Sequence, residues 1–200
     1  MTIITLKRDN LKMQKYYLHV VLTRTNTTMS KLIRFVKKDE YTHAAISLDK
    51  ELNYLYSFGR KHTYNPFLGR FKRENIDKGI YKFCETLPGV IIEIEVSSEQ
   101  YKKAKYLLNY FMLNSSCYKY NYRGLIHSLL DKPVCYDNRF LCSEFVYYIL
   151  KESGVVDFHI PRNLVRPQDF MVLESNIIYK GDLRKIVKTN SSNESFSALF

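Results

Sequence analysis

A cysteine at the head of an amphipathic segment is the feature that most constrains this chain. Cys142 lies near the start of the run FLCSEFVYYIL, in which Val146, Ile149 and Leu150 recur at helical spacing. We therefore predict a helix that begins at Cys142 and turns one face into the core. A thiol in that position meets the unpaired N–H groups of the first turn and the positive end of the helix dipole, and both favour the thiolate.

His43, far upstream, is the best candidate for a base beside this thiol. It precedes the alternating apolar segment AAISL, so we expect it at the end of a strand with its ring directed toward the helix. A nucleophile on a helix and a base on a strand is a common arrangement in Cys–His hydrolases. Two simpler interpretations stay open, because a free cysteine is often just a small buried apolar residue and a strand-end histidine can be bonded to the backbone.

The charge of the chain is strongly positive. Thirty-one lysines and arginines against 20 acids give a net charge of +11, which suits an anionic partner such as nucleic acid, an acidic lipid surface or an acidic polymer. The cations are spread along the chain, so a solvated basic surface is the simplest interpretation, and we expect no nucleic-acid partner. Since the chain has no tryptophan but 17 tyrosines and 12 phenylalanines, the core and the walls of any site should consist largely of Tyr and Phe.

The cysteine pattern argues against a metal site. None of the four cysteines belongs to a CxxC pair or has a metal-ligand spacing to histidine, so no metal and no cofactor are predicted. The first residues lack the apolar core of a signal peptide, and no stretch reaches transmembrane length. These observations predict free thiols in a reducing, cytoplasmic compartment.

The order of predicted elements indicates the fold class. Strands and one small helix come first, helices occupy the middle, and strands return at the end, which is typical of an α+β fold with a mostly antiparallel sheet packed by helices. Strands are expected at 16–23, 42–48, 53–58, 79–83, 90–96, 177–179 and 183–187. Helices are expected from Thr27 or Thr28, from a capping box at Ser97 and Gln100, over 122–130, from Cys142 to about Gly154, and from Pro167.

The remaining segments are predicted to be irregular. The stretch 64–78, with Pro66 and Gly69, is interpreted as a surface loop. Residues 1–15 are expected to be a flexible lead-in and 189–200 a flexible tail, on either side of a single domain at 16–188.

A group that orients the His43 ring is harder to find in the sequence. A hairpin turn at 49–50 would place residues 56–58 opposite His43, and Ser57 is the polar candidate among them. Ser57 could equally bond only to its local backbone. No acid lies at that strand end. Arg60, just beyond, could guide an anionic substrate but cannot accept a hydrogen bond from imidazole.

These segments together resemble a known family. The segments are LTRTNTTMSKLIR, YTHAAISLD, LYSFGRK, YKYNYRGL, FLCSEFVYYIL and VRPQDF. A histidine on a strand, a polar residue on the next strand and a later Cys-Ser-x-Phe-Val helix resemble the permuted papain-like amidases, the YiiX/YaeF-like branch of the NlpC-like cysteine hydrolases. In that branch the cysteine follows the histidine. The resemblance spans residues 17–169 and implies a permuted papain-like (NlpC-like) fold.

The resemblance also implies roles for individual residues. Cys142 would be the nucleophile and His43 the base. The third position in the family is often an acid, a histidine or another polar group, and Ser57 is the nearest match to it, although it departs from the acidic version. Tyr136 matches a tyrosine that the family places before the cysteine, near the substrate carbonyl; it could also be an exposed loop residue. The N–H groups of Cys142 and Ser143 would face an oxyanion at the helix end.

The predicted function is hydrolysis of an amide or ester through a thioester acyl-enzyme, as an amidase, a peptidase or an acyl hydrolase. The substrate could be a peptidoglycan peptide or a lipid, and the positive charge of the chain favours an acidic one. The alternative is a non-catalytic binding module of the same fold, which would use a basic, Tyr-rich surface to bind nucleic acid or a partner. Tyr118, Tyr120 and Tyr122 could form a base-stacking platform on such a surface or simply line the core.

Overall fold

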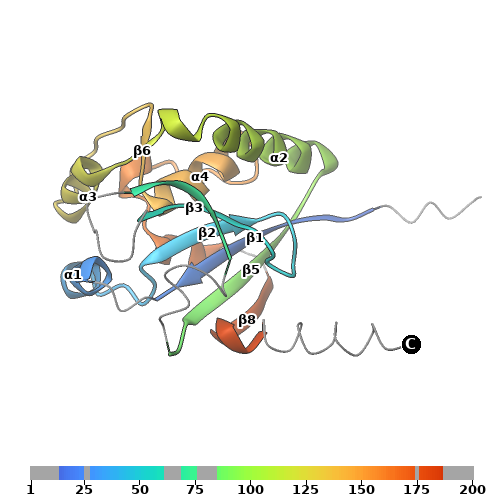
Figure 1. The fold of residues 1–200 in the computed structure, drawn as a ribbon, viewed down its shortest axis with the longest axis horizontal. Coiled ribbons are helices and arrows are strands. Elements are labelled where there is room, and N and C mark those ends of the chain that lie inside the picture. The colour runs from blue at the N-terminus through green and yellow to red at the C-terminus, as the bar shows by residue number, and fades with distance from the viewer. Residues whose placement is uncertain (1–13, 25–27, 61–68, 76–84, 174–175, 187–200) are drawn as a thin grey trace, which may run out of the picture.

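The computed structural model describes residues 14–24, 28–60, 69–75, 85–173 and 176–186 (Figure 1). These residues form a mixed α+β structure around a six-stranded sheet with the strand order β4-β3-β2-β1-β5-β8, in which every neighbouring pair is antiparallel. The α+β prediction is therefore confirmed. No helix in this part of the chain is long and apolar enough to cross a membrane.

The elements have the following bounds. The sheet consists of β1 (Tyr16–Thr23), β2 (His43–Ser47), β3 (Leu55–Arg60), β4 (Gly69–Glu74), β5 (Pro88–Val96) and β8 (Asn176–Asp182). A short parallel pair joins β6 (Lys119–Tyr120) to β7 (Arg139–Phe140). The α-helices are α1 (Thr28–Lys37), α2 (Ser98–Leu113), α3 (Tyr122–Leu129) and α4 (Cys142–Glu152), and the 3₁₀ helices are η2 (Ser115–Cys117), η3 (Arg162–Leu164) and η4 (Pro167–Val172).

The two longer helices, α2 and α4, pack over one side of the sheet (Figure 1). Their contact with β3 and β4 is a cluster of buried aromatic rings, in which the centroids of Phe111 and Phe145 lie 5.1 Å apart. Phe58 of β3 and Phe71 of β4 lie in the same cluster. Burial of such rings dominates core energetics, so this end of the sheet is anchored on α4, and side chains from both can be held in fixed positions.

The helix signals in the sequence are confirmed at α2 and α4. Ser97 caps α2, where its side chain accepts from the Gln100 N–H and the Gln100 side chain accepts in return from the Ser97 N–H. Helix α4 begins at Cys142 and buries an apolar face. Past its end, Gly154 takes the left-handed conformation, with φ of 73°, which glycine adopts without a Cβ penalty.

The predicted hairpin is present, but its turn and register are wrong. Residues 48–54 form a loop that separates β2 from β3. The Asp49 carboxylate stabilises this loop by accepting from the Asn53 N–H at 3.0 Å. Leu52 takes the left-handed conformation in it, with φ of 57°. Ile46 pairs with Tyr56. Continued along the strands, this register sets His43 level with Gly59 instead of residues 56–58, because the longer loop shifts every partner.

The predicted surface loop at 64–78 contains a strand. Strand β4 pairs along its whole length with β3, from Leu55 opposite Glu74 to Arg60 opposite Gly69. The strand was not predicted because its charged sequence, GRFKRE, lacks the alternation of apolar and polar residues that indicates a strand. Such charges are tolerated because β4 is the outermost strand of the sheet that the described residues form, and edge strands commonly carry charged side chains. The rest of this segment and the strand predicted at 79–83 lie outside the described residues.

The predicted second hairpin, around residues 180–182, is also wrong. Strand β8 runs through these residues to Asp182 and pairs with β5, and a helical turn at 183–186 follows it. The Asp182 carboxylate accepts from the backbone N–H groups of Leu87 and Arg184. A side chain that satisfies N–H groups at a strand end starts a turn of this kind.

Candidate active site

Cys142 is the first residue of α4. Leu141 before it has extended backbone, with φ of −80° and ψ of 168°, so the chain passes from β7 directly into the helix. The Cys142 thiol lies beside the His43 ring, and the backbone N–H groups of Ala44 and Ser143 lie near its sulfur, where all three lower the pKa of the thiol. The residue is only 7% exposed.

His43 lies between this thiol and a carboxylate. It is the first residue of β2, and its Nε2 lies 3.2 Å from Oε2 of Glu74, the last residue of β4. Since Nε2 faces Glu74, Nδ1 is the ring nitrogen left for Cys142. Three elements that are distant in sequence thus bring Cys142, His43 and Glu74 into one row.

The electrostatics of this row favour a thiolate beside an imidazolium. Burial by itself lowers the pKa of His43, but hydrogen bonds to Cys142 and Glu74 and the negative charges of both outweigh burial and raise it to about 10. Burial raises the pKa of the Cys142 thiol, whereas the hydrogen bond and charge of His43 and the two backbone N–H groups lower it further than burial raises it. Each partner therefore stabilises the charged form of the other.

Glu74 is held ionised by several groups. Burial tends to raise the pKa of its carboxyl group, but His43 and the Lys72 ammonium hold it well below its usual range. Lys72 forms an ion pair with Oε1, and Ser57 donates to Oε2 at 2.8 Å. Gly59 leaves the space for this pair, because a Cβ there would lie 2.8 Å from the Lys72 side chain.

Ser57 therefore does not take the place that the sequence analysis gave it. The position beside Nε2 of His43 belongs to Glu74, and Ser57 bonds to the same carboxylate oxygen from behind. No acid lies at the end of β3, but Glu74 at the end of the next strand, β4, supplies one. Sequence reasoning missed Glu74 and Lys72 because β4 was interpreted as loop. The signal that could have identified Glu74 is its place as the single acid at the end of the basic run GRFKRE.

A buried acid fixes the turn that carries Cys142. Glu144 is fully buried and accepts from the Leu141 N–H at 2.5 Å and from the Asn121 side chain at 3.1 Å. Asn121 in turn accepts from the Gly124 N–H at the start of α3, and a Cβ at Gly124 would lie 2.1 Å from the Asn121 side chain. Burial raises the pKa of Glu144, although its hydrogen bonds oppose that effect. This network ties the first turns of α3 and α4 together.

A small pocket of about 40 Å³ reaches Cys142. Its walls come from the end of α1, from α3, from the start of α4 and from the segment before η4. The pocket is lined by Lys37, Asp39, Thr42, Tyr120, Leu125, Ser128, Leu129, Leu141, Cys142, Ser143, Val165, Arg166 and Pro167. Tyr120, rather than Tyr136, is the tyrosine in this lining.

The other predicted site residues lie in different surroundings. The Ser143 hydroxyl donates to the Val165 carbonyl at 2.6 Å, which links the start of α4 to the wall of the pocket. The Ser143 N–H lies near the thiol. Tyr136 is half-buried in the loop before β7, where its carbonyl accepts from Arg162. Arg60 ends β3, and its side chain lies outside the described part of the chain.

The remaining cysteines do not join the site. Cys117 and Cys135 are free and exposed, and Cys84 lies outside the described residues. Within the described ranges, no group of three or more His, Cys, Asp or Glu side chains could hold a metal ion.

Comparisons with known proteins add no family to this picture: the chain matches no protein-family model, no curated protein and no solved structure.

Proposed function

We propose that this protein is a cysteine hydrolase of the permuted papain-like type, acting on an amide or ester bond. The observation that carries the proposal is the row Cys142–His43–Glu74, in which a thiol at a helix start lies beside an imidazole that is hydrogen-bonded to a carboxylate. That row contains a nucleophile, a base and an orienter, the three parts that covalent acyl transfer needs. The chain order, with His43 before Cys142, is the order of the permuted branch.

The proposed reaction begins with the Cys142 thiolate attacking the carbonyl carbon of the substrate. The N–H groups of the first α4 turn and of Ala44, which stabilise negative charge on sulfur, would do the same for the adjacent oxyanion. The His43 imidazolium gives its proton to the leaving amine or alkoxide, and a thioester remains. Neutral His43 then takes a proton from water as its oxygen attacks, and the thiolate is released with the acid product.

Glu74 would act throughout as the positioning group. It keeps the imidazole ring in one orientation and stabilises the imidazolium form, as a buried carboxylate does in a triad. Lys72 and Ser57 hold Glu74 in turn.

The pocket indicates what part of a substrate would lie next to the thiol. Leucine, valine and proline side chains make up much of its lining, and Lys37 and Arg166 contribute cations. Lys37 is paired with Asp131 at 2.6 Å and Arg166 with Asp39 at 3.0 Å, so these charges are partly compensated. A small or aliphatic acyl group fits this lining better than a charged one.

An acylation experiment tests the proposal. The full chain is mixed with p-nitrophenyl acetate, and the release of p-nitrophenolate is followed together with mass spectrometry of the protein. We expect a burst equal to the enzyme concentration and an acetyl adduct on Cys142. The matched controls are Cys142→Ala, which should remove both signals, and Cys135→Ser, which should keep them. An unchanged burst in Cys142→Ala, or adducts only on Cys117 and Cys135, would overturn the proposal.

The second candidate, a binding module that kept the fold without the chemistry, is favoured by one observation. Cys142 is nearly buried and its pocket is small. The thiol beside His43 and the ionised Glu74 weigh against it, since a module has no need of a buried ion pair that is costly to desolvate. The absence of any burst would favour this candidate.

A further inference from the structure

Two helices that border the Cys142 pocket present exposed apolar and cationic side chains at one end of the molecule. Helix α1 contributes Lys37 to the pocket, and α3 contributes Leu125, Ser128 and Leu129. The Lys37–Asp131 ion pair joins the two at the C-terminal end of each helix. Figure 1 shows α1 and α3 at the same end of the molecule.

The outer side of α1 combines cations with an exposed phenylalanine. Lys31, Arg34, Phe35 and Lys38 recur at spacings of three and four residues, so they share one side of the helix and its end. All four are exposed, and Phe35 is 84% exposed. On α3, Arg123, Ile126 and Leu130 repeat the pattern, with Ile126 59% and Leu130 61% exposed. We call these seven residues the α1–α3 face.

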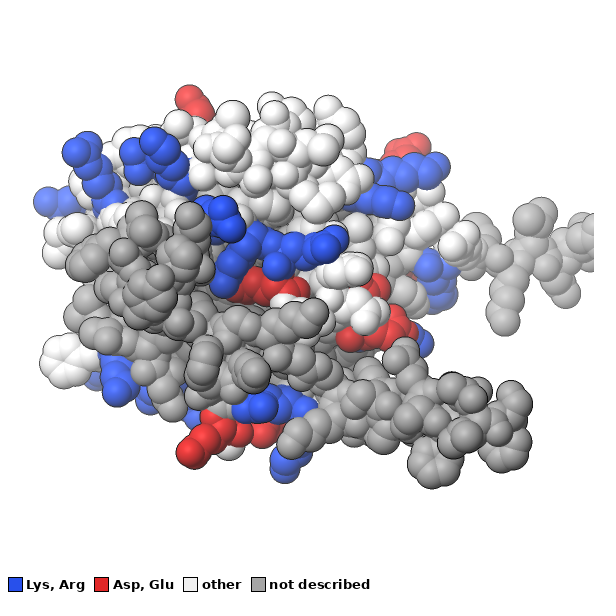
Figure 2. All heavy atoms as spheres, viewed as in Figure 1, with Lys and Arg blue, Asp and Glu red and all other residues white. Residues whose placement is uncertain are grey.

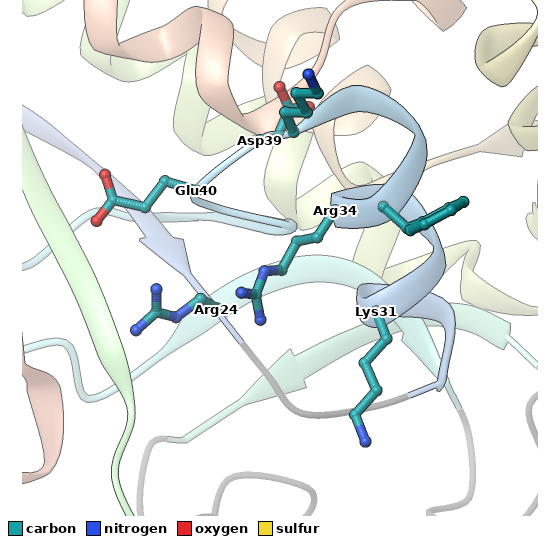
Figure 3. Close-up of a pocket in the computed structure, with 7 residues that line it drawn as sticks. Arg24, Lys31, Arg34, Asp39 and Glu40 are labelled. Carbon is teal, nitrogen blue, oxygen red and sulfur yellow. The ribbon is translucent and has the colours of Figure 1, made fainter.

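Four cations of this region form no ion pair with a carboxylate among the described residues. Within the described part of the chain, none of Arg24, Lys31, Arg34 and Lys38 lies within ion-pair distance of a carboxylate. Figure 3 shows the Arg34 side chain extending toward Arg24, whose own guanidinium points away from it. With Lys31, Phe35, Lys38 and the acids Asp39 and Glu40, they line an open hollow of about 510 Å³, in which the cations outnumber the carboxylates. Among the coloured atoms of Figure 2, lysine and arginine predominate at this end of the molecule.

We infer that the α1–α3 face docks on an anionic phospholipid surface. The partner must be anionic, to match the cations, and must offer hydrocarbon, to cover Phe35, Ile126 and Leu130. A bilayer interface offers both, because headgroup phosphates lie directly above acyl chains. Phosphate oxygens would enter the hollow beside Arg34 and Lys31, and the apolar side chains would insert next to it.

The composition of the face distinguishes a lipid from a nucleic acid. Nucleic acid would satisfy the cations, but bases stack on aromatic rings. Ile126, Leu130 and the neighbouring Val36, which is 45% exposed, are aliphatic and cannot stack. Docking itself does not require a reactive Cys142. Docking would also turn the mouth of the Cys142 pocket toward the lipid, and the use of that orientation in catalysis rests on the proposed function.

The test is sedimentation of the full chain with vesicles of diether lipids, which carry no acyl ester for Cys142 to cleave. Vesicles of phosphatidylcholine with phosphatidylglycerol are compared with phosphatidylcholine alone. We expect binding only to the anionic vesicles, and weakening as salt rises, because salt screens exposed charges. An absence of binding, or equal binding to both kinds of vesicle, would overturn the inference.

Paired variants locate the binding face. Lys31→Glu with Arg34→Glu should weaken binding by about 30-fold or more, since each cation near an anionic surface contributes roughly a factor of five. Lys102→Glu with Lys105→Glu, exposed positions on α2, changes the net charge equally and should keep binding within a few-fold. Equal losses in both pairs would mean a diffuse charge effect and would overturn the inference.

A second pair of double variants tests the contribution of the apolar side chains of the α1–α3 face to vesicle binding. Phe35→Ser with Leu130→Ser should reduce binding about tenfold, by the loss of inserted apolar area. Tyr106→Ser with Leu113→Ser, at α2 positions that are 65% and 81% exposed, should not reduce it. Circular dichroism melting checks that all variants fold. If the chain instead binds a single-stranded RNA oligomer through Lys31 and Arg34 and ignores vesicles, the partner is nucleic acid and the inference fails.

The docking test and the acylation test fail independently. Cys142→Ala should bind vesicles as the wild-type chain does. Vesicle binding without any acyl adduct would therefore reject the hydrolase and keep the docking face, and the reverse result would reject only the docking face.

Discussion

Two histidine–glutamate pairs lie in the same sheet with the same spacing, and only one of them belongs to the candidate active site. His19 Nε2 lies 3.2 Å from Glu93 Oε2, and His43 Nε2 lies 3.2 Å from Glu74 Oε2. His19 and Glu93 are direct cross-strand partners in β1 and β5. His43 and Glu74 belong to β2 and β4, with β3 between them.

The two pairs differ in what surrounds the second ring nitrogen. In His19, Nδ1 is buried and has no hydrogen-bond partner among the residues that the structure describes. In His43, the ring meets the thiol at the N-terminus of α4, and the Lys72 ammonium and Ser57 hydroxyl hold the carboxylate on its other side. A histidine beside a carboxylate is thus not in itself a site, and the start of α4 converts one pair into a row that can carry out chemistry. The predictions below separate the two pairs.

The largest effect is expected for His43→Ala on the alkylation of Cys142 by iodoacetamide at pH 6. A thiol with an ordinary pKa near 8.5 is about 0.3% ionised at that pH, so loss of the imidazolium should slow labelling by up to about 300-fold. Peptide mass spectrometry measures the rate at each cysteine. His19→Ala is the matched control and should leave the rate unchanged. Wild-type labelling that favours Cys117 or Cys135 would remove Cys142 from the nucleophile role.

Glu74→Gln should have the next largest effect. The substitution keeps the side-chain shape but removes the charge that stabilises the imidazolium. Hydrogen bonds to charged groups are worth about 1.5–3 kcal/mol, so labelling of Cys142 at pH 6 should slow about 30-fold. Glu93→Gln should change the rate by less than a few-fold. If the two variants behave alike, the two pairs are equivalent and Glu74 is not the orienter.

Glu74→Gln should also change how the free energy of unfolding depends on pH. The pKa of Glu74 is lower in the folded protein than in the unfolded chain, so the charged group stabilises the fold above about pH 4.5 and loses that contribution as pH falls. The difference in unfolding free energy between wild type and Glu74→Gln should therefore shrink from pH 7 to pH 3. Urea titrations at each pH measure it. A difference that grows toward acid would contradict the assigned ionisation.

His19→Ala should affect stability rather than reactivity. The ring is 2% exposed, so its removal leaves a cavity and takes the hydrogen bond from Glu93, while it also removes an unsatisfied nitrogen. These effects partly cancel, and we expect a loss of about 1–2 kcal/mol in urea unfolding. If His19→Ala instead slows the alkylation of Cys142 strongly and leaves the free energy of unfolding unchanged, His19 acts on the thiol and the contrast drawn between the two pairs is wrong.

The smallest effect is expected for Ser57→Ala. The Ser57 hydroxyl donates to the Glu74 carboxylate, and His43 and Lys72 still bind that carboxylate after the hydroxyl is removed. Labelling of Cys142 should slow by about threefold or less, far less than in Glu74→Gln. A loss as large as that of Glu74→Gln would restore Ser57 as a main orienter of the ring.

Local sequence determined the parts of the protein that depend on neighbours along the chain. Apolar periodicity predicted α2 and α4, the Ser97 capping box was visible as a motif, and Cys142 was placed at the start of its helix. These predictions held because helical contacts link residues three and four apart, so the sequence contains both partners of each contact.

Tertiary structure alone decided the third member of the row. Glu74 reaches His43 because β4 pairs with β3 and the β2–β3 loop is longer than a two-residue turn. Strand register depends on loop geometry, and an edge strand can be as charged as GRFKRE, so neither was visible in the sequence. The sequence also contains two histidines that meet carboxylates, and only the position of the α4 N-terminus in space determines which of them has a thiol beside it.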